Sequence, residues 1–424
     1  MNAFRIGFAG MSHLGVCSAF VAAKKEFQSI CFDPNPVVVS ELCAHRFSVY
    51  EPGLLELSRS VSAQIAFTSD ARDLSGVDVC FVSADVPTDS MGRSDLQSIR
   101  NLVSVVDEAL GGNAPVVLLS QVPPGFSREL NKRPEQLFYQ VETLVFGQAL
   151  ERALKPERFI VGCATPAAPL PTAYRKFLES FGCPILQMRY ESAELAKIAV
   201  NMFLVSSVTT TNTIAELCEQ VAADWQEIAP ALRLDRRIGQ HAYLAPGLGI
   251  GGGNLERDLV AFEELAAAKG SDAGIIEAWR RNSVRRGKWA HELLLRLMPA
   301  YSMSPTVGVL GLAYKQDTAS TRNSAGVELI RRVPPNWSVQ AFDPAVEGEG
   351  SWRANGFVTA KDEYDTCHGA DALAIMTPWP RFRAIDVGAL ARRMRGKIIV
   401  DPHGVLDAQA CRQAGLEHFQ LGRG

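Results

Sequence analysis

Two stretches of the chain alternate short runs of β-branched residues with longer helical patterns, and this alternation constrains the fold more than any other feature. The first stretch extends from Arg5 to about Gly162 and the second from 306 to 401. Strands separated by helices indicate a parallel sheet with crossover connections. Each stretch also closes an early strand with the same tripeptide, Phe32-Asp33-Pro34 and Phe342-Asp343-Pro344. The chain is therefore predicted to contain two related α/β domains.

The segment between these stretches is predicted to be helical. Residues Glu191 to Glu219 lack glycine and proline, and their apolar positions recur every three or four residues, as in one long helix. Further helical patterns follow at 255–269 and 272–298. We therefore expect an α/β fold in which two Rossmann-like parallel-sheet domains are joined by a helical middle domain with a long central helix. The predicted domains comprise residues 1–188, 189–300 and 301–424.

Composition argues against several classes of function. The formal net charge of -3 provides no basic field, so nucleic acid and anionic membranes are not expected as partners. The seven histidines and nine cysteines show no zinc-type spacing, so no metal site is expected. The N-terminus has no secretory signal pattern, and no run of about 18 apolar residues is present to span a membrane. These features predict a cytoplasmic protein with free thiols.

A glycine-rich turn follows the first predicted strand. It reads Gly10-Met-Ser12-His-Leu-Gly15 and opens a helical pattern. In a dinucleotide-binding fold the first glycine permits the tight turn, the second brings the backbone close to the pyrophosphate, and the third packs helix on sheet. Ser12 replaces the middle glycine, and because serine is small this replacement does not exclude a cofactor.

Asp33 ends the second predicted strand, 23 residues after Gly10. A carboxylate at this place suits the ribose hydroxyls of NAD and repels the 2′-phosphate of NADP. Capping of the strand end would explain the same residue without a cofactor. NAD is the predicted cofactor, and the predicted binding residues on this stretch are Gly10, Ser12, His13, Leu14, Gly15 and Asp33.

Seven short motifs follow the order and spacing of one enzyme family. They are Glu51-Pro-Gly-Leu54, Ser120-Gln-Val-Pro-Pro-Gly125, Glu194-x-x-Lys197-x-x-x-Asn201, Asn212-x-Ile-Ala215, Arg237-Ile-Gly239, Leu310-Gly-Leu-Ala-Tyr-Lys315 and Thr377-x-Trp379-x-x-Phe382. Each motif is weak alone, but together they extend over nearly the whole chain. On these motifs the chain resembles the UDP-glucose/GDP-mannose dehydrogenase family.

The resemblance implies an NAD domain, a dimer-forming helical middle and a C-terminal domain that holds the nucleotide diphosphate. Enzymes of this family oxidise the C6 alcohol of a nucleotide-linked hexose in two hydride transfers, through aldehyde, thiohemiacetal and thioester to a uronic acid. The implied partners are a nucleotide-sugar substrate and a second copy of the chain, paired through the central helix.

Several catalytic residues of the family are retained. Lys197 and Asn201 are four residues apart on one helix face, where the family pair steadies the oxygen at C6 as it becomes an oxyanion. Asp258 matches the family aspartate that transfers a proton through water. Glu142 matches the first glutamate of the family segment Asn-Pro-Glu-Phe-Leu-x-Glu-Gly-x-Ala. A solvated helix face and a helix-terminal carboxylate would explain Lys197, Asn201 and Asp258 without catalysis.

Residues for the covalent and hydrolytic steps are replaced. In the family loop Gly-x-Gly-Gly-x-Cys-x-x-Lys-Asp, Asn254 takes the place of the nucleophilic cysteine, and an amide is not nucleophilic. Phe146 replaces the second glutamate, which is the candidate base for thioester hydrolysis, and Gln121 replaces a threonine that helps to hold catalytic water. Arg257 replaces the loop lysine. His403 takes the place of a family arginine, whose charge it could replace only when protonated.

The family pattern also places binding residues. Arg237 matches an arginine that reaches the substrate of the neighbouring subunit, and Lys315 and Arg322 match contacts to nucleotide and cofactor. Exposed arginines often serve solubility alone. The glycine-rich stretch 247–253 lacks the Lys-Ser/Thr ending of a phosphate loop, and we expect it to close over the sugar. The predicted substrate site consists of Arg237, Tyr243, Gly249, Gly251 and Lys315, and Thr88, Gln121 and Arg322 complete the predicted cofactor site.

The oxyanion and proton-transfer residues are kept while the thioester residues are lost. We therefore expect an NAD-dependent dehydrogenase that acts on a UDP-linked hexose, with a two-electron oxidation to an aldehyde or ketone. Two alternatives remain open. One is a non-catalytic nucleotide-sugar-binding or regulatory relative, which Ser12, Asp85 and Asn254 favour. The other is a complete four-electron oxidation to a uronate through a gem-diol that needs no cysteine.

Overall fold

The computed structural model describes residues 4–48, 51–84, 86, 95–252, 254–298, 304–346 and 357–424, without the side chain of Asn254. The chain divides into two compact units, Met1–Val200 and Asn201–Gly424, called the N-terminal and C-terminal units below. The predicted domain boundaries after residues 188 and 300 stay a prediction.

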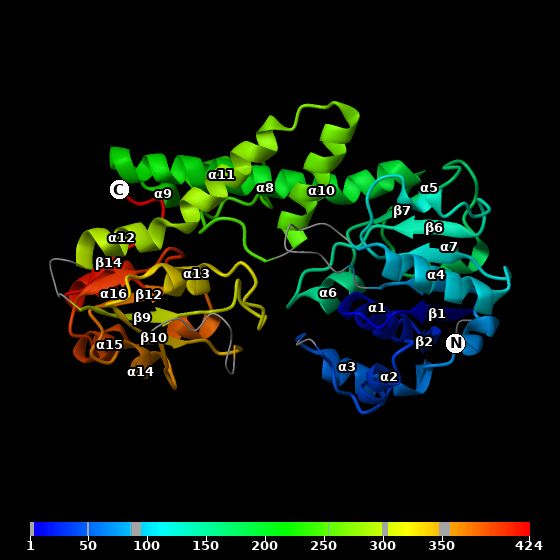
Figure 1. The fold of residues 1–424 in the computed structure, drawn as a ribbon, viewed down its shortest axis with the longest axis horizontal. Helices are drawn as coiled ribbons and strands as arrows, with labels where there is room; N and C mark the ends of the chain where they lie inside the picture. The colour runs from blue at the N-terminus through cyan, green and yellow to red at the C-terminus, as the bar shows by residue number, and fades with distance from the viewer. Residues whose placement is uncertain are drawn as a thin grey trace. The chain divides into compact units, whose positions relative to one another are not determined.

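An eight-stranded sheet forms the centre of the N-terminal unit (Figure 1). Its strand order is β3-β2-β1-β4-β5-β6-β7-β8, and all neighbouring strands are parallel except β6 and β7. The order reverses between β1 and β4, which opens a crevice at the carboxyl ends of these strands. The strands are β1 (Arg5–Ala9), β2 (Gln28–Phe32), β3 (Ile65–Thr68), β4 (Val79–Val82), β5 (Val116–Leu118), β6 (Leu137–Gln140), β7 (Phe159–Cys163) and β8 (Ile185–Arg189).

Helices cover both faces of this sheet, because its strands are apolar on both sides. Phe8 and Phe81 pack into one core with α1, α6 and α7, whereas Cys80 and Val82 pack into a second core with α4. Both cores consist almost entirely of buried aliphatic and aromatic side chains. The helices are α1 (His13–Lys24), α2 (Pro36–Cys43), α3 (Leu54–Ser60), α4 (Gln97–Leu110), α5 (Phe126–Glu129), α6 (Ala149–Leu154) and α7 (Thr172–Glu179).

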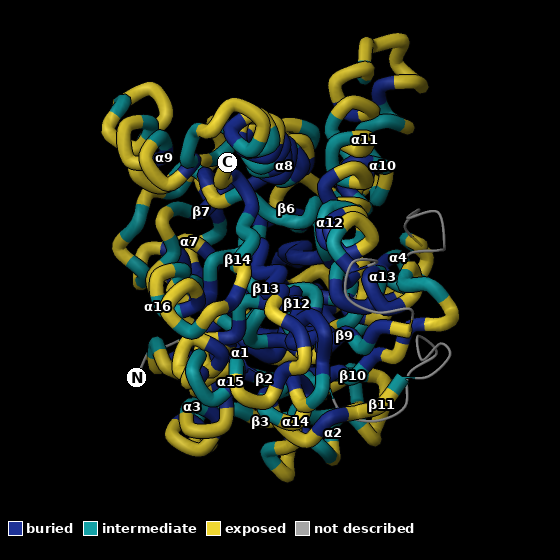
Figure 2. Tube along the Cα trace, turned by 90° about the vertical axis from the view of Figure 1, so that its left-hand side faces the viewer, coloured by how far each residue is buried: buried dark blue, intermediate teal, exposed yellow. Residues whose placement is uncertain are grey.

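A six-stranded parallel sheet forms the core of the C-terminal unit. Its order is β11-β10-β9-β12-β13-β14, with α12 and α13 packed on one face and α14, α15 and α16 on the other. Figure 2 shows the strands of the sheets as mostly buried and the outer helices as more exposed. The strands are β9 (Thr306–Leu310), β10 (Ser338–Phe342), β11 (Phe357–Thr359), β12 (Ala372–Ile375), β13 (Ile398–Val400) and β14 (Glu417–Phe419).

Helices of the C-terminal unit lead into this sheet and connect its strands. They are α9 (Trp225–Leu234), α10 (Asn254–Lys269), α11 (Gly274–Gly287), α12 (Trp289–Leu297), α13 (Ala325–Arg332), α14 (Glu363–Cys367), α15 (Val387–Arg393) and α16 (Ala408–Gln413). The predicted fold, with two parallel-sheet domains and a helical middle, is confirmed.

The long helix α8 extends from Tyr190 to Val221, close to the predicted limits. It buries Glu194, whose carboxylate accepts hydrogen bonds from the backbone N–H groups of Gly125 and Ser127 at 2.6 and 2.8 Å. By length and composition alone α8 could cross a membrane, although no spanning helix was expected from the sequence. The core helix of a soluble protein passes the same test, and the polar partner groups of Glu194 fit that role.

The repeated Phe-Asp-Pro tripeptide has a structural counterpart in the two sheets. Gly10 and Gly311, which follow β1 and β9, both have positive φ angles, 85° and 99°. Asp33 accepts a hydrogen bond from the Met11 N–H at 2.8 Å, and Asp343 accepts one from the Leu312 N–H at 2.7 Å. In both halves, an aspartate that follows the second strand therefore holds the backbone that follows the first strand.

Candidate active site

The turn between β1 and α1 requires glycine at both ends. Gly10 has φ +85°, and a Cβ there would lie 3.1 Å from the Ala84 backbone nitrogen. A Cβ on Gly15 would collide with the Gly10 carbonyl oxygen and the Ser83 hydroxyl. Ser12 caps α1 by accepting the Gly15 N–H at 3.3 Å, and its own hydroxyl donates to the Ser83 carbonyl at 2.5 Å. The hydroxyl of Ser12 is thus held by the protein.

Asp33 holds the turn in place and keeps capacity for a ligand. One carboxylate oxygen accepts the Met11 N–H at 2.8 Å and the other accepts the Asn35 N–H at 2.9 Å. Each oxygen can accept a second hydrogen bond. The corresponding Asp343 of the C-terminal sheet accepts more donors, including the indole N–H of Trp379 at 3.1 Å. The carboxylate of the first half is therefore the better ribose site.

A cavity of about 620 Å³ opens at the carboxyl ends of β1 and β2. The predicted cofactor residues Gly10, Ser12, His13 and Asp33 line it together with Phe146. Its size suits a small-molecule or cofactor site, and its place at the reversal of strand order is where a dinucleotide binds in such sheets. The residues present therefore fit NAD.

His13 has contacts that the sequence analysis missed. Its ring stacks on Phe146 with centroids 4.7 Å apart and an interplanar angle of 16°. Its Nε2 lies 3.2 Å from a carboxylate oxygen of buried Glu51. Glu51 also accepts the backbone N–H groups of Gly147 and Ala149 at 2.9 and 2.6 Å. Phe146 thus lines the cofactor cavity, and the hydrogen bonds from Gly147 and Ala149 to Glu51 hold the segment that contains Phe146 in place.

Glu142 and Lys197 interact within the N-terminal unit. Burial raises the pKa of Glu142 to about 7, although a hydrogen bond from Gln140 and the positive charge of Lys197 both lower it. The amide of Gln140 donates to Glu142 at 2.5 Å and accepts the hydroxyl of Tyr174 at 3.0 Å. Glu142 can therefore exchange a proton near neutral pH.

Asn201 and Asp258 meet inside the C-terminal unit. Both are buried, and the Asn201 amide nitrogen donates a hydrogen bond to the Asp258 carboxylate across 57 positions of sequence. Arg257 places its Nε 3.8 Å from the other oxygen of Asp258. Asn254 begins α10 one turn before Asp258, so the loop, the proton-transfer candidate and the oxyanion candidate converge at this helix start. Lys197 lies one turn before Asn201 on α8.

The glycine-rich loop before α10 is tied to neighbouring segments. Gly249 has φ +88°, and a Cβ there would lie 2.5 Å from the Ser283 carbonyl oxygen. The Ser283 hydroxyl accepts the Ile250 N–H at 2.7 Å. A Cβ on Gly251 would lie 3.3 Å from a ring atom of Tyr314. The loop is closely fitted at Gly249 and Gly251, which explains why glycine occupies these two positions.

The C-terminal part of this loop contacts the segment that follows β9. The Gly252 N–H donates to the Arg322 carbonyl at 3.2 Å, and the Asn323 amide donates to the Gly252 carbonyl at 2.8 Å. Lys315 lies with its amino group 5.8 Å from the centroid of the Tyr314 ring. The structure therefore brings Gly249, Gly251, Lys315 and Arg322 into one region.

The remaining predicted residues are not among the described residues that line the cofactor cavity. Arg237 is exposed and bonds Asp235, with the shortest contact at 2.6 Å, and Tyr243 is 52% exposed. Gln121 follows Ser120 beyond β5, Leu14 lies in the first turn of α1, and Thr88 lies outside the described residues.

His403 does not replace an arginine. Burial lowers the pKa of His403, so its ring is neutral at pH 7, and its Nε2 can only donate to the Met376 carbonyl, which lies 3.4 Å away. All nine cysteines are free, as predicted. The described part of the chain contains no group of three or more histidine, cysteine, aspartate or glutamate residues that could hold a metal ion.

Known proteins resemble the chain along its whole length. It is 25% identical over 433 residues to UDP-glucose 6-dehydrogenase TuaD of Bacillus subtilis (strain 168), covering 99% of this chain and 93% of that protein. Among solved structures, a UDP-glucose dehydrogenase from Pyrobaculum islandicum shares 27% identity with a TM-score of 0.83, covering 100% of this chain and 98% of that one. A UDP-D-ManNAc dehydrogenase from Pyrococcus horikoshii shares the fold, with 24% identity, a TM-score of 0.84 and 99% coverage of both chains.

Models of a single family match three consecutive parts of the sequence. The family's NAD binding domain matches residues 4–178, its central domain residues 191–283 and its UDP binding domain residues 308–408. These matches agree with the cofactor cavity, the long helix and the second parallel sheet. The chain therefore belongs to the UDP-glucose/GDP-mannose dehydrogenase family.

Proposed function

We propose that this nucleotide-sugar dehydrogenase oxidises the C6 alcohol of a UDP-linked hexose by two electrons and releases the carbonyl product. The observation that carries the proposal is the buried hydrogen bond between Asn201 and Asp258 at the start of α10. It keeps an amide and a carboxylate together beside the loop in which Asn254 replaces the family cysteine. Relatives named UDP-glucose 6-dehydrogenase support the choice of substrate.

NAD, when bound, accepts the hydride from the sugar carbon. Gly10 and Gly15 give the backbone the close turn that a pyrophosphate needs, and Asp33 would accept hydrogen bonds from the ribose hydroxyls of the bound cofactor. The carboxylate of Asp33 also disfavours the phosphate of NADP. These residues therefore bind and orient the cofactor.

The remaining polar groups manage the proton and the developing charge. Asp258 receives the alcohol proton through water, and the Nε of Arg257 lies 3.8 Å from one of its carboxylate oxygens. The amide of Asn201 has two N–H donors, and only one is used by Asp258. The second donor and the ammonium of Lys197 stabilise the oxygen as it becomes an alkoxide.

The chemistry stops after one hydride transfer because groups for the next step are missing. The amide of Asn254 cannot attack the carbonyl product. Phe146 cannot act as a base, and its ring is engaged in the stack with His13. Gln121 takes the place of a threonine that holds water in the family. The residues that would form a covalent intermediate and hydrolyse it are therefore both absent from this site.

We also propose a cytoplasmic homodimer that pairs through α8. Several apolar side chains on this helix are exposed, among them Phe203, Leu217 and Val221, which have 80%, 59% and 61% of their surface accessible. Covering such side chains would favour association. Arg237 is exposed in the same unit, as a residue that reaches a neighbouring subunit must be.

Product analysis over a panel of nucleotide sugars tests the proposed reaction. Purified protein, excess NAD and each sugar are incubated, NADH is counted at 340 nm, and the product is identified by mass. We expect one NADH per sugar and a product lighter by two hydrogens. Two NADH per sugar with a carboxylate would refute the two-electron reaction, and tight sugar binding without any NADH would support a regulatory relative instead.

The variant Asp258→Asn tests the assigned role of the carboxylate. It preserves the shape of the side chain and should lower kcat by about 100-fold or more, because the proton acceptor is lost. Glu264→Gln, an exposed substitution on the same helix, is the control and should leave kcat unchanged. Equal kcat values for both variants would contradict the assignment.

A further inference from the structure

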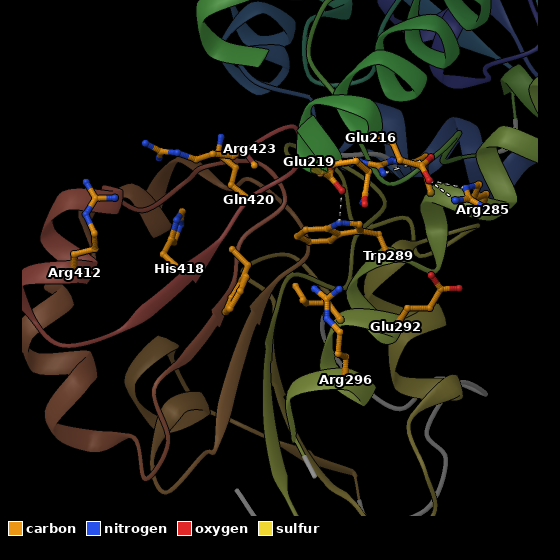
Figure 3. Close-up of a pocket in the computed structure, with 15 residues that line it drawn as sticks. Glu216, Glu219, Arg285, Trp289, Glu292, Arg296, Arg412, His418, Gln420 and Arg423 are labelled. Atoms are coloured by element: carbon orange, nitrogen blue, oxygen red, sulfur yellow. Dashed lines mark hydrogen bonds and ion pairs between the residues drawn. The ribbon is translucent and has the colours of Figure 1, made fainter. Parts of the chain in front are cut away.

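A second cavity, of about 660 Å³, lies within the C-terminal unit (Figure 3). Its walls come from the last turns of α8, from α11 and α12, and from α16, β14 and the residues after β14. Among the described residues that line it there is none of the predicted catalytic, cofactor or substrate residues. The cavity is therefore separate from the candidate active site.

Glu219 holds the walls of this cavity together. One of its carboxylate oxygens accepts hydrogen bonds from Arg286 at 2.7 Å and from the Gly422 N–H at 2.9 Å. The other accepts the indole N–H of Trp289 at 3.2 Å. Arg286 is almost completely buried. This network joins α8, α11, α12 and the segment after β14, so the cavity has a fixed base.

Most charged side chains that the structure describes along the cavity walls have a partner of opposite charge, and two arginines do not. Glu216 is paired with Arg285, and Glu219 with Arg286. His418 lies 3.1 Å from the carboxylate of Asp401, Arg423 lies 3.4 Å from that of Asp224, and Glu292 is near Arg285. Among the described residues, Arg296 and Arg412 have no ion-pair partner within 4.0 Å. They come from α12 and α16 and reach the cavity from different walls (Figure 3). Two guanidinium groups are thus available to an anion.

Aromatic side chains complete the lining. Trp289 and Phe419 both contribute to the walls and are only half-buried, so part of each ring faces the cavity. Tryptophan and phenylalanine rings stack on planar heterocycles, whereas guanidinium groups bind phosphate oxygens in a bidentate manner. The amide of Gln420 adds a donor and an acceptor to the same wall.

We propose that this cavity binds a nucleoside phosphate, with the base on Trp289 and the phosphates on Arg296 and Arg412. The site is independent of the proposed oxidation, since it shares no residue with it. Its size accommodates one nucleotide. Because it joins the end of α8 to the second sheet, a bound nucleotide would bridge elements that Glu219 already connects.

Calorimetric titration of GDP into the full-length protein tests the site. Wild type should show a binding event that disappears, or weakens at least tenfold, in the double variant Arg296→Ala/Arg412→Ala, since each lost charge-assisted contact is worth about tenfold in Kd. The matched control is Arg281→Ala/Arg392→Ala, which removes two exposed arginines outside the cavity. GDP bound at the candidate active site would persist in all three proteins.

A second comparison tests the base. Trp289→Leu should weaken GDP binding about tenfold and leave inorganic pyrophosphate binding unchanged, because stacking is lost but the arginines remain. Equal GDP binding by wild type and the Arg296→Ala/Arg412→Ala variant, or equal loss in the control variant, would overturn the proposal. Equal weakening of GDP and pyrophosphate by Trp289→Leu would overturn the assignment of the base.

Discussion

Replacing Glu142 with glutamine should stabilise the N-terminal unit more at pH 8 than at pH 5. The ordinary pKa of this side chain is 4.5, and burial raises it to about 7 in the folded protein. The neutral form is therefore favoured by folding, and the stability that it contributes is lost as the pH rises from about 4.5 to about 7. Glutamine preserves the acceptor for Gln140 but cannot ionise.

The size of the effect follows from the two pKa values. Ionisation of Glu142 costs about 3 kcal/mol of folding free energy at pH 8 and about 1 kcal/mol at pH 5. The gain in free energy of unfolding from Glu142→Gln should therefore increase by about 2 kcal/mol between pH 5 and pH 8. Partial contact of the side chain with water reduces this increase.

Hydrogen exchange read by mass spectrometry on peptides from β6 measures this free energy locally. All six tryptophans lie within residues 201–424, so their fluorescence follows the C-terminal unit and should not change. Glu151→Gln is the control, because Glu151 is exposed on α6 of the same unit. A pH-independent effect of Glu142→Gln, or the same pH dependence in the control, would refute the reasoning.

Three further substitutions test the cofactor end and the loop. Asp33→Asn should weaken NADH binding about tenfold, whereas NADPH binding should stay the same or improve. Fluorescence titration measures both dissociation constants. An unchanged ratio of the NADH and NADPH dissociation constants would show that Asp33 does not select the cofactor. Asn254→Cys should not yield a uronate by mass spectrometry, since the other replaced residues remain, and a uronate at full rate would contradict their joint role. Gly249→Ala should raise KM strongly, because the residue has φ +88° and the new Cβ would lie 2.5 Å from the Ser283 carbonyl oxygen. The control Gly247→Ala should leave KM unchanged, because no atom lies within 4 Å of a Cβ there. Similar KM values for the two variants would contradict the close fit of the loop.

The elements and their order could be predicted from the sequence because they depend on local patterns. Alternating apolar runs and helical periodicity located both sheets, and the helix expected over 191–219 is observed over Tyr190–Val221. The glycines at positions 10 and 15 could be placed for the same reason, since a tight turn between strand and helix excludes a Cβ. The membrane-like hydropathy of α8 was missed, because polar residues interrupt its apolar run.

The environment of the site residues could not be predicted in this way. The sequence placed Asn201 on a helix and Asp258 near a helix start, but only the packing of α10 against α8 joined them over 57 positions. From the sequence, Phe146 was interpreted only as the replacement of a catalytic base. The tertiary structure shows that its ring stacks on His13 and lines the cofactor cavity.

By itself, the sequence determined which segments are strands and helices, where the backbone needs glycine, and which family the motifs resemble. Tertiary structure alone decided the neutral state of His403, the near-neutral pKa of Glu142 and the second cavity beside Trp289. Propensity and periodicity act between neighbouring residues, whereas desolvation, ion pairing and cavity shape arise from segments that are distant in sequence.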